Sequence, residues 1–272
     1  MQNELPSQPL IEHLLELRRR LMIAAVAFIA AVCVCYGFAD KIYAFLVHPL
    51  SEAFPDPSSR RLIYTGLTEA FMTYLRLALF AGFLISFPII AAQLYLFLAP
   101  GMYKEERKAF LPYLIAAPIM FAVGAAFVYY GIFPAAWKFF LGFETPDAGG
   151  LPIQLEARMG DYLSLVMNLI IAFGLSFQLP VVLVLLVKSG MMGVEKLKAG
   201  RRYAIVIIVA IAAVITPPDV FSQIALSVPL YMLYEVSILL CNNRHARAAR
   251  SADPGIHGSP DDALASPRMT KE

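Results

Sequence analysis

Residues 13–38 read HLLELRRRLMIAAVAFIAAVCVCYGF, a charged segment followed at once by an apolar one. The apolar part, 21–38, has 18 residues without a charge, close to the ~20 that a helix needs to cross about 30 Å of hydrocarbon. Three consecutive arginines precede it, and Glu16 lies one turn before them. This pattern predicts a membrane-entering helix in which Glu16 pairs with Arg19 or Arg20 at the i+3 or i+4 position.

The composition of the whole chain indicates a membrane protein. Of 272 residues, 59% are hydrophobic and 15% are charged, whereas soluble domains carry about 25% charge. The mean hydropathy is +0.67. A basic segment before an apolar run is also typical of a cleaved signal peptide, but several further apolar runs follow, and a cleaved leader does not explain those. We therefore expect an all-α membrane protein.

The apolar runs predict six transmembrane helices. Their expected ranges are 21–38, 77–98, 109–133, 162–187, 203–215 and 220–240. The fifth range has 13 residues, about 20 Å as a helix, which is shorter than the hydrocarbon core and predicts a locally thin membrane beside it. The sixth contains Pro229, so we expect the last two spans to be short or broken by proline.

Prolines and an aromatic residue mark the connections between these spans. Pro49 indicates a turn in the connection 39–74, whose apolar residues also predict a short interfacial helix. Trp137 is expected at the membrane edge of the loop 135–160. Pro217 and Pro218 predict a sharp turn between the last two spans.

The basic residues predict the orientation. An even number of spans places both termini on one side, and of the 22 Lys and Arg residues only six fall on the opposite side: Lys41, Arg60, Arg61, Arg76, Lys138 and Arg158. The positive-inside rule therefore predicts that both termini are cytoplasmic. The expected parts are an amphipathic N-terminus (1–20), a membrane domain (21–240) and a disordered, polar tail (241–272).

Nothing in the sequence indicates an enzyme, a metal site or a cofactor. The three cysteines fit small apolar positions, and His13 and His48 are expected on opposite sides of the membrane. A six-span transporter of small solutes is the alternative function, but the halves 1–135 and 136–272 do not visibly repeat. An intramembrane protease would need an acid dyad or a Ser/His pair within the spans, and the sequence has neither.

Three motifs, in this order, resemble the TatC family. They are HLLELRRRL (13–21), FLAPGMYKEERK (97–108) and ITPPDVFSQ (215–223), and the resemblance runs from about residue 10 to about residue 245. TatC is the core subunit of the twin-arginine protein translocase. The resemblance implies a concave bundle of six helices in the bacterial cytoplasmic (inner) membrane.

The resemblance also implies a function and partners. TatC binds the twin-arginine signal peptides of folded precursor proteins, works with TatA and TatB, and depends on the proton-motive force. It implies a homo-oligomer within a receptor complex, contact with membrane lipids, and no role for nucleic acid.

The site residues that the resemblance implies for the signal peptide are Glu16 and Glu106, with Arg18, Phe97 and Arg107 beside them. A carboxylate suits this role because the guanidinium fork donates two parallel hydrogen bonds to it, which a lysine cannot reproduce. The segment 104–108 also fits a self-neutralised, solvated turn, and both interpretations remain open at this point.

A second group of residues is implied to dock the transmembrane helix of TatA or TatB: Gln178, Thr216, Asp219 and Gln223. Many TatC proteins have Glu where this chain has Gln178, and an amide cannot change its protonation state. Gln178 equally fits a hydrogen bond between helices of the bundle. Asp219 also fits a helix cap that accepts from the amides of Phe221 or Ser222.

Overall fold

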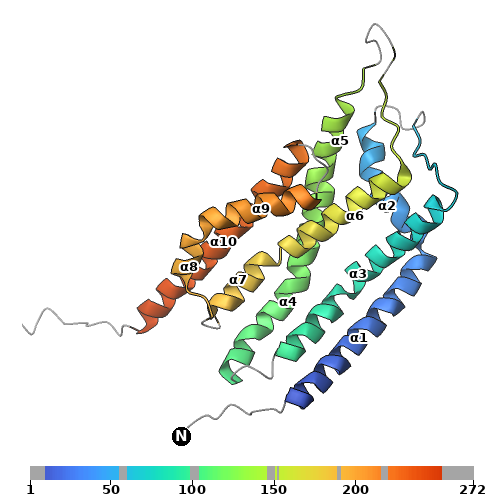
Figure 1. The fold of residues 1–272 in the computed structure, drawn as a ribbon. Coiled ribbons are helices and arrows are strands. Elements are labelled where there is room, and N and C mark those ends of the chain that lie inside the picture. The colour runs from blue at the N-terminus through green and yellow to red at the C-terminus, as the bar shows by residue number, and fades with distance from the viewer. Residues whose placement is uncertain are drawn as a thin grey trace, which may run out of the picture.

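The protein is a bundle of long helices inclined along one direction (Figure 1). The computed structural model describes residues 10–54, 60–98, 104–145, 151, 153–188, 191–215 and 220–252. Within these helices, the side chains at 10, 98, 104–111, 215, 221–222 and 243–252 lie outside the description. The start of α1 and the end of α10 lie at the same end of the bundle, here called the N-terminal end (Figure 1).

The regular secondary structure of the described ranges is helical, and turns, short loops and two isolated β-bridges connect the helices. The helices, in chain order, are α1 (Leu10–Gly37), α2 (Ala39–Ala53), α3 (Glu69–Leu98), α4 (Lys104–Phe127), the π-helix η3 (Val128–Ile132), α5 (Phe133–Leu141), α6 (Met159–Ser176), α7 (Leu179–Lys188), α8 (Val194–Ala199), α9 (Arg201–Ile215) and α10 (Val220–Ala252). This confirms the prediction of an all-α fold.

Five helical segments in the described ranges are long and apolar enough to cross a membrane: Ile11–Gly37, Glu69–Phe97, Pro112–Leu141, Met159–Lys188 and Gln223–Asn242. The segment expected as the fifth span is α9, which has 15 residues and is about 22 Å long. It is short, as predicted from the sequence. Next to it, α10 continues through Pro229 and extends to Ala252, beyond the expected domain boundary at 241.

Helix α1 lies along α3 at one edge of the bundle (Figure 1). Few of its side chains are buried, as expected for a helix that presents most of its surface to lipid. The two helices approach closely at Gly82, where a Cβ atom would lie 2.5 Å from the Val32 Cγ2 atom and 2.9 Å from its Cα. A small residue at such a crossing lets two membrane helices pack through their backbones.

The third transmembrane segment is longer than the sequence indicated. We expected it to end near Pro134, but the helix continues through η3 and α5 to Leu141. Proline has no N–H group, and its ring clashes with the carbonyl four residues earlier. The widened π turn at Val128–Ile132 includes Tyr130, four residues before Pro134, and gives the ring room, so the helical segment continues past the proline.

Trp137, which the sequence places at the membrane edge, is buried within the bundle. Only 5% of it is exposed, because it lies inside α5 and its ring is 5.2 Å from Tyr162 and 5.6 Å from Phe133, measured between centroids. Its Nε1 atom has no hydrogen-bond partner in the described part of the chain. Trp137 therefore joins α5 to α6 through its ring contacts.

Pro49 does not form a turn, as the sequence had indicated, but lies buried inside α2. Since Pro49 has no N–H group, the carbonyl of Phe45 loses its partner within the helix. The Tyr129 hydroxyl donates to this Phe45 oxygen at 2.7 Å, and the Tyr162 hydroxyl donates to the next carbonyl, of Leu46, at 2.9 Å. Two tyrosines from distant segments thus satisfy the carbonyls around the proline and hold α2 in place.

Removing the Tyr129 hydroxyl should destabilise the protein mainly while Pro49 is present. We expect Tyr129→Phe to lower the free energy of unfolding by ~1–3 kcal/mol, because a partly buried acceptor is left unsatisfied. In a Pro49→Ala background the new backbone amide at position 49 donates to the Phe45 carbonyl. Tyr129→Phe should then lower the free energy of unfolding by less than half as much. Thermal unfolding of the four proteins of this double-mutant cycle in detergent measures the coupling. An equal loss of unfolding free energy on Tyr129→Phe with and without Pro49 would show that the hydroxyl does not compensate for the proline.

Candidate functional site

The residues expected to bind a signal peptide belong to the start of α1, the end of α3 and the start of α4. These three helix ends lie together at the N-terminal end of the bundle (Figure 1). Helix α1 runs antiparallel to α3, so its residues meet α3 in reverse order. The His13 ring stacks on Phe97 with centroids 4.4 Å apart and planes inclined by 21°. Deeper along the same seam, Arg20 Nη1 donates to Gln93 Oε1 at 3.4 Å.

Glu16 lies on this seam between the two contacts. Arg20 Nη2 donates to its Oε1 atom at 3.2 Å, so the predicted ion pair forms at the i+4 position. The Glu16 side chain is 23% exposed, and its Oε2 atom makes no hydrogen bond within the described residues. Arg18 is exposed on the same helix. The site therefore offers one partly buried, half-occupied carboxylate at the place where α1 enters the membrane.

Helix α4 contributes its first turns to the same end of the bundle. Glu106 and Arg107 lie in these turns, since α4 begins at Lys104, and their side chains lie outside the description. A carboxylate near a helix N-terminus is stabilised by the free amides and the helix dipole. The structure thus brings Glu16, Phe97 and the backbone of Glu106 to one end of the bundle from three different helices.

Gln178 is bonded to a neighbouring helix within the bundle. Its Nε2 atom donates to the Ala117 carbonyl of α4 at 3.0 Å and to the Gly174 carbonyl of its own segment at 3.4 Å. The backbone amide of Gln178 donates instead to Leu175, because the helix breaks before Pro180, and this leaves the Gly174 carbonyl to the side chain. The hydrogen bond between helices, one of the two interpretations of Gln178, is therefore present.

The same side chain borders an apolar groove of about 650 Å³ between α3, α4 and α7, lined among others by Phe87, Leu94, Tyr113 and Val182. The remaining candidates for partner docking are less well defined. Gln223 lies near the start of α10, while Thr216, Pro217, Pro218 and Asp219 lie outside the described residues.

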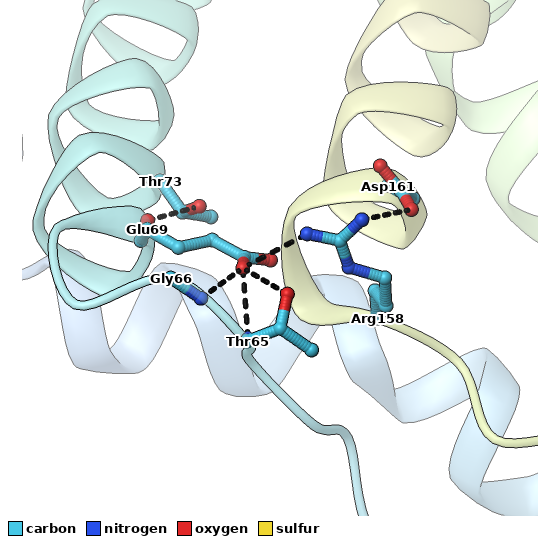
Figure 2. Close-up of polar contacts among 6 residues, drawn as sticks. All are labelled: Thr65, Gly66, Glu69, Thr73, Arg158 and Asp161. Carbon is cyan, nitrogen blue, oxygen red and sulfur yellow. Dashed lines mark hydrogen bonds and ion pairs between the residues drawn. The ribbon is translucent and has the colours of Figure 1, made fainter.

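Two arginine–carboxylate clusters at the opposite end were not anticipated from the sequence. In the first (Figure 2), Glu69 Oε2 accepts from the backbone amides of Thr65 at 3.0 Å and Gly66 at 3.1 Å, and from Arg158 Nη2 at 3.2 Å. Arg158 also approaches Asp161 at 3.8 Å. Glu69 is the first residue of α3, and its carboxylate accepts from two backbone amides of the turn that leads into this helix. No local pattern in the sequence indicates its contact with Arg158, which is distant in the chain.

The second cluster joins the same two extramembrane segments. Arg60 donates to both oxygens of Glu144 at 2.8 and 2.9 Å, and the Leu155 amide donates to Glu144 at 2.8 Å. Backbone hydrogen bonds of Ile63 with Ala157 and Met159 lie between the two clusters. The Leu155 amide and, after it, the Arg60 guanidinium lower the pKa of the Glu144 carboxyl. These contacts fasten the loop before α3 to the loop before α6.

This cluster should loosen in acid. A carboxylate with a lowered pKa in the folded protein contributes stability above its unfolded pKa of about 4.3 and loses it as the pH falls through the folded value. We therefore expect hydrogen exchange at the Leu155 amide to be slow at neutral pH, relative to its intrinsic rate, and to lose protection below about pH 4. In the Glu144→Gln variant, protection of the Leu155 amide from hydrogen exchange, corrected for the intrinsic pH dependence of exchange, should be the same at neutral and acidic pH. A wild-type protein with unchanged protection in acid would contradict this.

The fold and its polar sites together define a class of protein. The chain is a multi-pass helical membrane protein, and no cluster of His, Cys, Asp or Glu that could hold a metal ion occurs in the ranges that the structure describes. Charged groups of the described residues gather at the two ends of the bundle, in the contacts of Glu16, Glu69 and Glu144, and Gln178 borders the groove.

Comparison with known proteins identifies the family. The family "Sec-independent protein translocase protein (TatC)" matches residues 12–229. The TatC protein of Rickettsia prowazekii is 49% identical over 231 residues, which cover 85% of this chain and 91% of that protein. The Escherichia coli K12 protein is 38% identical over 233 residues, covering 85% and 87%. The chain therefore belongs to the TatC family, as the three motifs predicted.

The solved structures agree with this assignment. A crystal structure of a twin-arginine translocase receptor TatC superposes with a TM-score of 0.73 at 36% identity, covering 85% of this chain and 98% of that one. A second, in dodecyl maltoside (DDM), gives a TM-score of 0.74. As a family member, the protein is a multi-pass component of the Sec-independent translocase in the bacterial inner membrane, and it is a transport protein, not an enzyme.

Proposed function

We propose that this protein is the signal-peptide receptor and core scaffold of a twin-arginine translocase, and that it recognises the paired arginines of folded precursors through Glu16 and Glu106. The observation that carries this proposal concerns Glu16, which lies between α1 and α3 near the start of the first apolar helix. Its carboxylate is partly buried, and one of its two oxygens makes no hydrogen bond within the described residues. A guanidinium is the group best suited to such an acceptor.

The surroundings of Glu16 support recognition of an extended peptide. Phe97 and His13 form an aromatic wall beside the carboxylate, against which an apolar peptide side chain packs. Glu106 takes the second arginine of the pair. Arg18 and Arg107, the neighbouring cations, orient the carboxylates or contact anionic lipid headgroups.

The groove beside Gln178 is the proposed docking place for the single transmembrane helix of TatA or TatB. Its lining is apolar except for the Gln178 amide and the tyrosine side chains, and it lies within the bundle segment that spans the membrane. Thr216, Asp219 and Gln223 would bind the polar end of that helix. Because Gln178 cannot titrate, proton-motive force acts elsewhere in the assembly, which contains several copies of the protein.

The test is a comparison of two peptides. A fluorescent signal peptide with Arg-Arg is titrated into the purified protein in detergent, alongside the same peptide with Lys-Lys. Because charge-assisted hydrogen bonds contribute ~1.5–3 kcal/mol each, we expect the Arg-Arg peptide to bind about 10- to 100-fold more tightly. Equal affinity for the two peptides would overturn the receptor function.

A further inference from the structure

Positive charge gathers at the N-terminal end of the bundle, where α8 packs against the last part of α10 (Figure 1). The apolar segment of α10 ends at Asn242, and an apolar segment ends where the lipid headgroups begin. Lys198 Nζ donates to Asn242 Oδ1 at 3.2 Å, and the Tyr234 hydroxyl donates to the Leu197 carbonyl at 2.7 Å. These contacts place α8 beside the headgroups of one leaflet.

The helices α8, α9 and α10 contain two carboxylates, and each already has a cationic partner. Glu235 Oε2 accepts from Arg201 Nη2 at 2.9 Å, and its Oε1 accepts from the Tyr231 hydroxyl at 2.9 Å. Glu195 Oε1 accepts from Lys198 at 3.4 Å. Neither carboxylate forms an ion pair with a further cation in the described part of the chain. The remaining cations of α8 and α9 therefore lack a counter-charge from these carboxylates.

These remaining cations are Lys196 and Arg202. Both are exposed, and neither forms an ion pair within the described residues. The Arg202 guanidinium lies 4.8 Å from the centroid of the Tyr203 ring, and its Nη2 atom donates to the Tyr203 hydroxyl at 3.2 Å. This contact holds the guanidinium beside an exposed tyrosine, a residue type enriched at membrane interfaces, and leaves most of its five N–H donors for a ligand.

Helix α10 adds three more cations next to the same membrane edge. It continues without a break from Asn242 to Ala252, about 15 Å beyond the apolar segment. The sequence of this extension contains Arg244, Arg247 and Arg250 and no acidic residue. Because positions three apart lie on the same side of a helix, these three arginines belong to one helix face.

We infer that the headgroups of anionic phospholipids bind to five cations at this membrane edge, namely Lys196, Arg202, Arg244, Arg247 and Arg250. A cluster of about four to eight Lys and Arg residues directly at the end of a membrane helix attracts such headgroups, because each cation near the charged surface adds to the attraction. Arginine suits a phosphodiester because its guanidinium fork donates to two oxygens at once. The inference is independent of the proposed function, since it uses no residue of the signal-peptide site.

The experiment measures which lipid lies next to α8 in a bilayer. A fluorophore is attached to the full chain at an introduced cysteine, Ala199→Cys, which is an exposed position on α8, and the exposed Cys33 is replaced by serine. The protein is reconstituted into vesicles of phosphatidylcholine and phosphatidylglycerol. A nitroxide near the headgroup end of the acyl chain, on one lipid or the other, quenches the fluorophore only at close range. The ratio of the two quenching strengths gives the local enrichment of the anionic lipid.

We expect phosphatidylglycerol to be enriched about fivefold beside α8 at low salt, and the enrichment to fall towards one as salt screens the charges. Replacing the three arginines of the α10 extension by glutamine should reduce the enrichment to about half, and adding Lys196→Gln and Arg202→Gln should abolish it. The matched control removes three exposed cations from the other end of the bundle and should leave the enrichment unchanged. Its substitutions are Lys41→Gln, Arg61→Gln and Arg76→Gln.

Three results would overturn the inference. The first is equal quenching by the two lipids in the protein with all five cations, which would leave these residues to a protein partner or to the helix dipole. The second is an enrichment that the control reduces as much as the triple arginine variant does. The third is an enrichment that high salt does not reduce, and this measurement needs no variant in the cluster. Loss of the preference for the Arg-Arg peptide with lipid enrichment intact would count against the receptor function alone.

Discussion

The double variant Glu16→Gln, Glu106→Gln should lose the preference for the Arg-Arg peptide and nearly all transport. Each amide keeps the size of the side chain and removes the charge that a guanidinium binds. A charge-assisted hydrogen bond contributes ~1.5–3 kcal/mol, so the two changes together should weaken Arg-Arg binding by about 100-fold or more. The measurement is the same peptide titration, accompanied by export of a folded reporter protein in cells that lack their own TatC.

A matched control lies on the same helix. Glu12 is an exposed carboxylate one turn before Glu16, so Glu12→Gln removes an equal charge at the same end of the bundle. It should leave the preference for arginine intact. If the double variant still binds Arg-Arg better than Lys-Lys, neither carboxylate is the acceptor and the site must be sought elsewhere.

The variant Gly124→Val should prevent α4 from packing on α6. A Cβ atom at Gly124 would lie 2.7 Å from the Phe173 carbonyl oxygen and 2.9 Å from the Phe177 ring. A Cβ atom at the opposing Gly174 would lie 2.6 Å from the Phe121 ring. The carbonyl cannot move without displacing α6, and overpacking even in adaptable cores typically costs ~1–3 kcal/mol. We expect the upper end of this range or more, seen as a large drop in the temperature of unfolding in detergent.

Gly131→Ala is the control for this substitution. Gly131 lies further along the same helical segment, and an added Cβ would find its nearest neighbour, Phe127, at 4.0 Å. The unfolding temperature of this variant should stay near that of the wild type. A Gly124→Val protein as stable as the Gly131→Ala protein would show that the α4–α6 contact tolerates separation.

The sequence by itself determined that the chain forms long apolar helices and to which family it belongs. Uncharged apolar runs predict the long helices because a bilayer leaves the backbone no other way to satisfy its hydrogen bonds. The short length of α9 was visible for the same reason, and the pairing of Glu16 with Arg20 followed from helical spacing alone. These features depend on residues that are close together in the chain.

The tertiary structure decided what each proline, aromatic and charged residue contacts. Pro49 lies in a helix because Tyr129 and Tyr162, far along the chain, satisfy carbonyls of α2. Trp137 is buried because α5 lies against α6, and Arg158 meets Glu69 because their loops run side by side. Proline and tryptophan have strong local preferences, but a distant partner that supplies a hydrogen bond or a packing surface overrides them, and no local pattern encodes that partner.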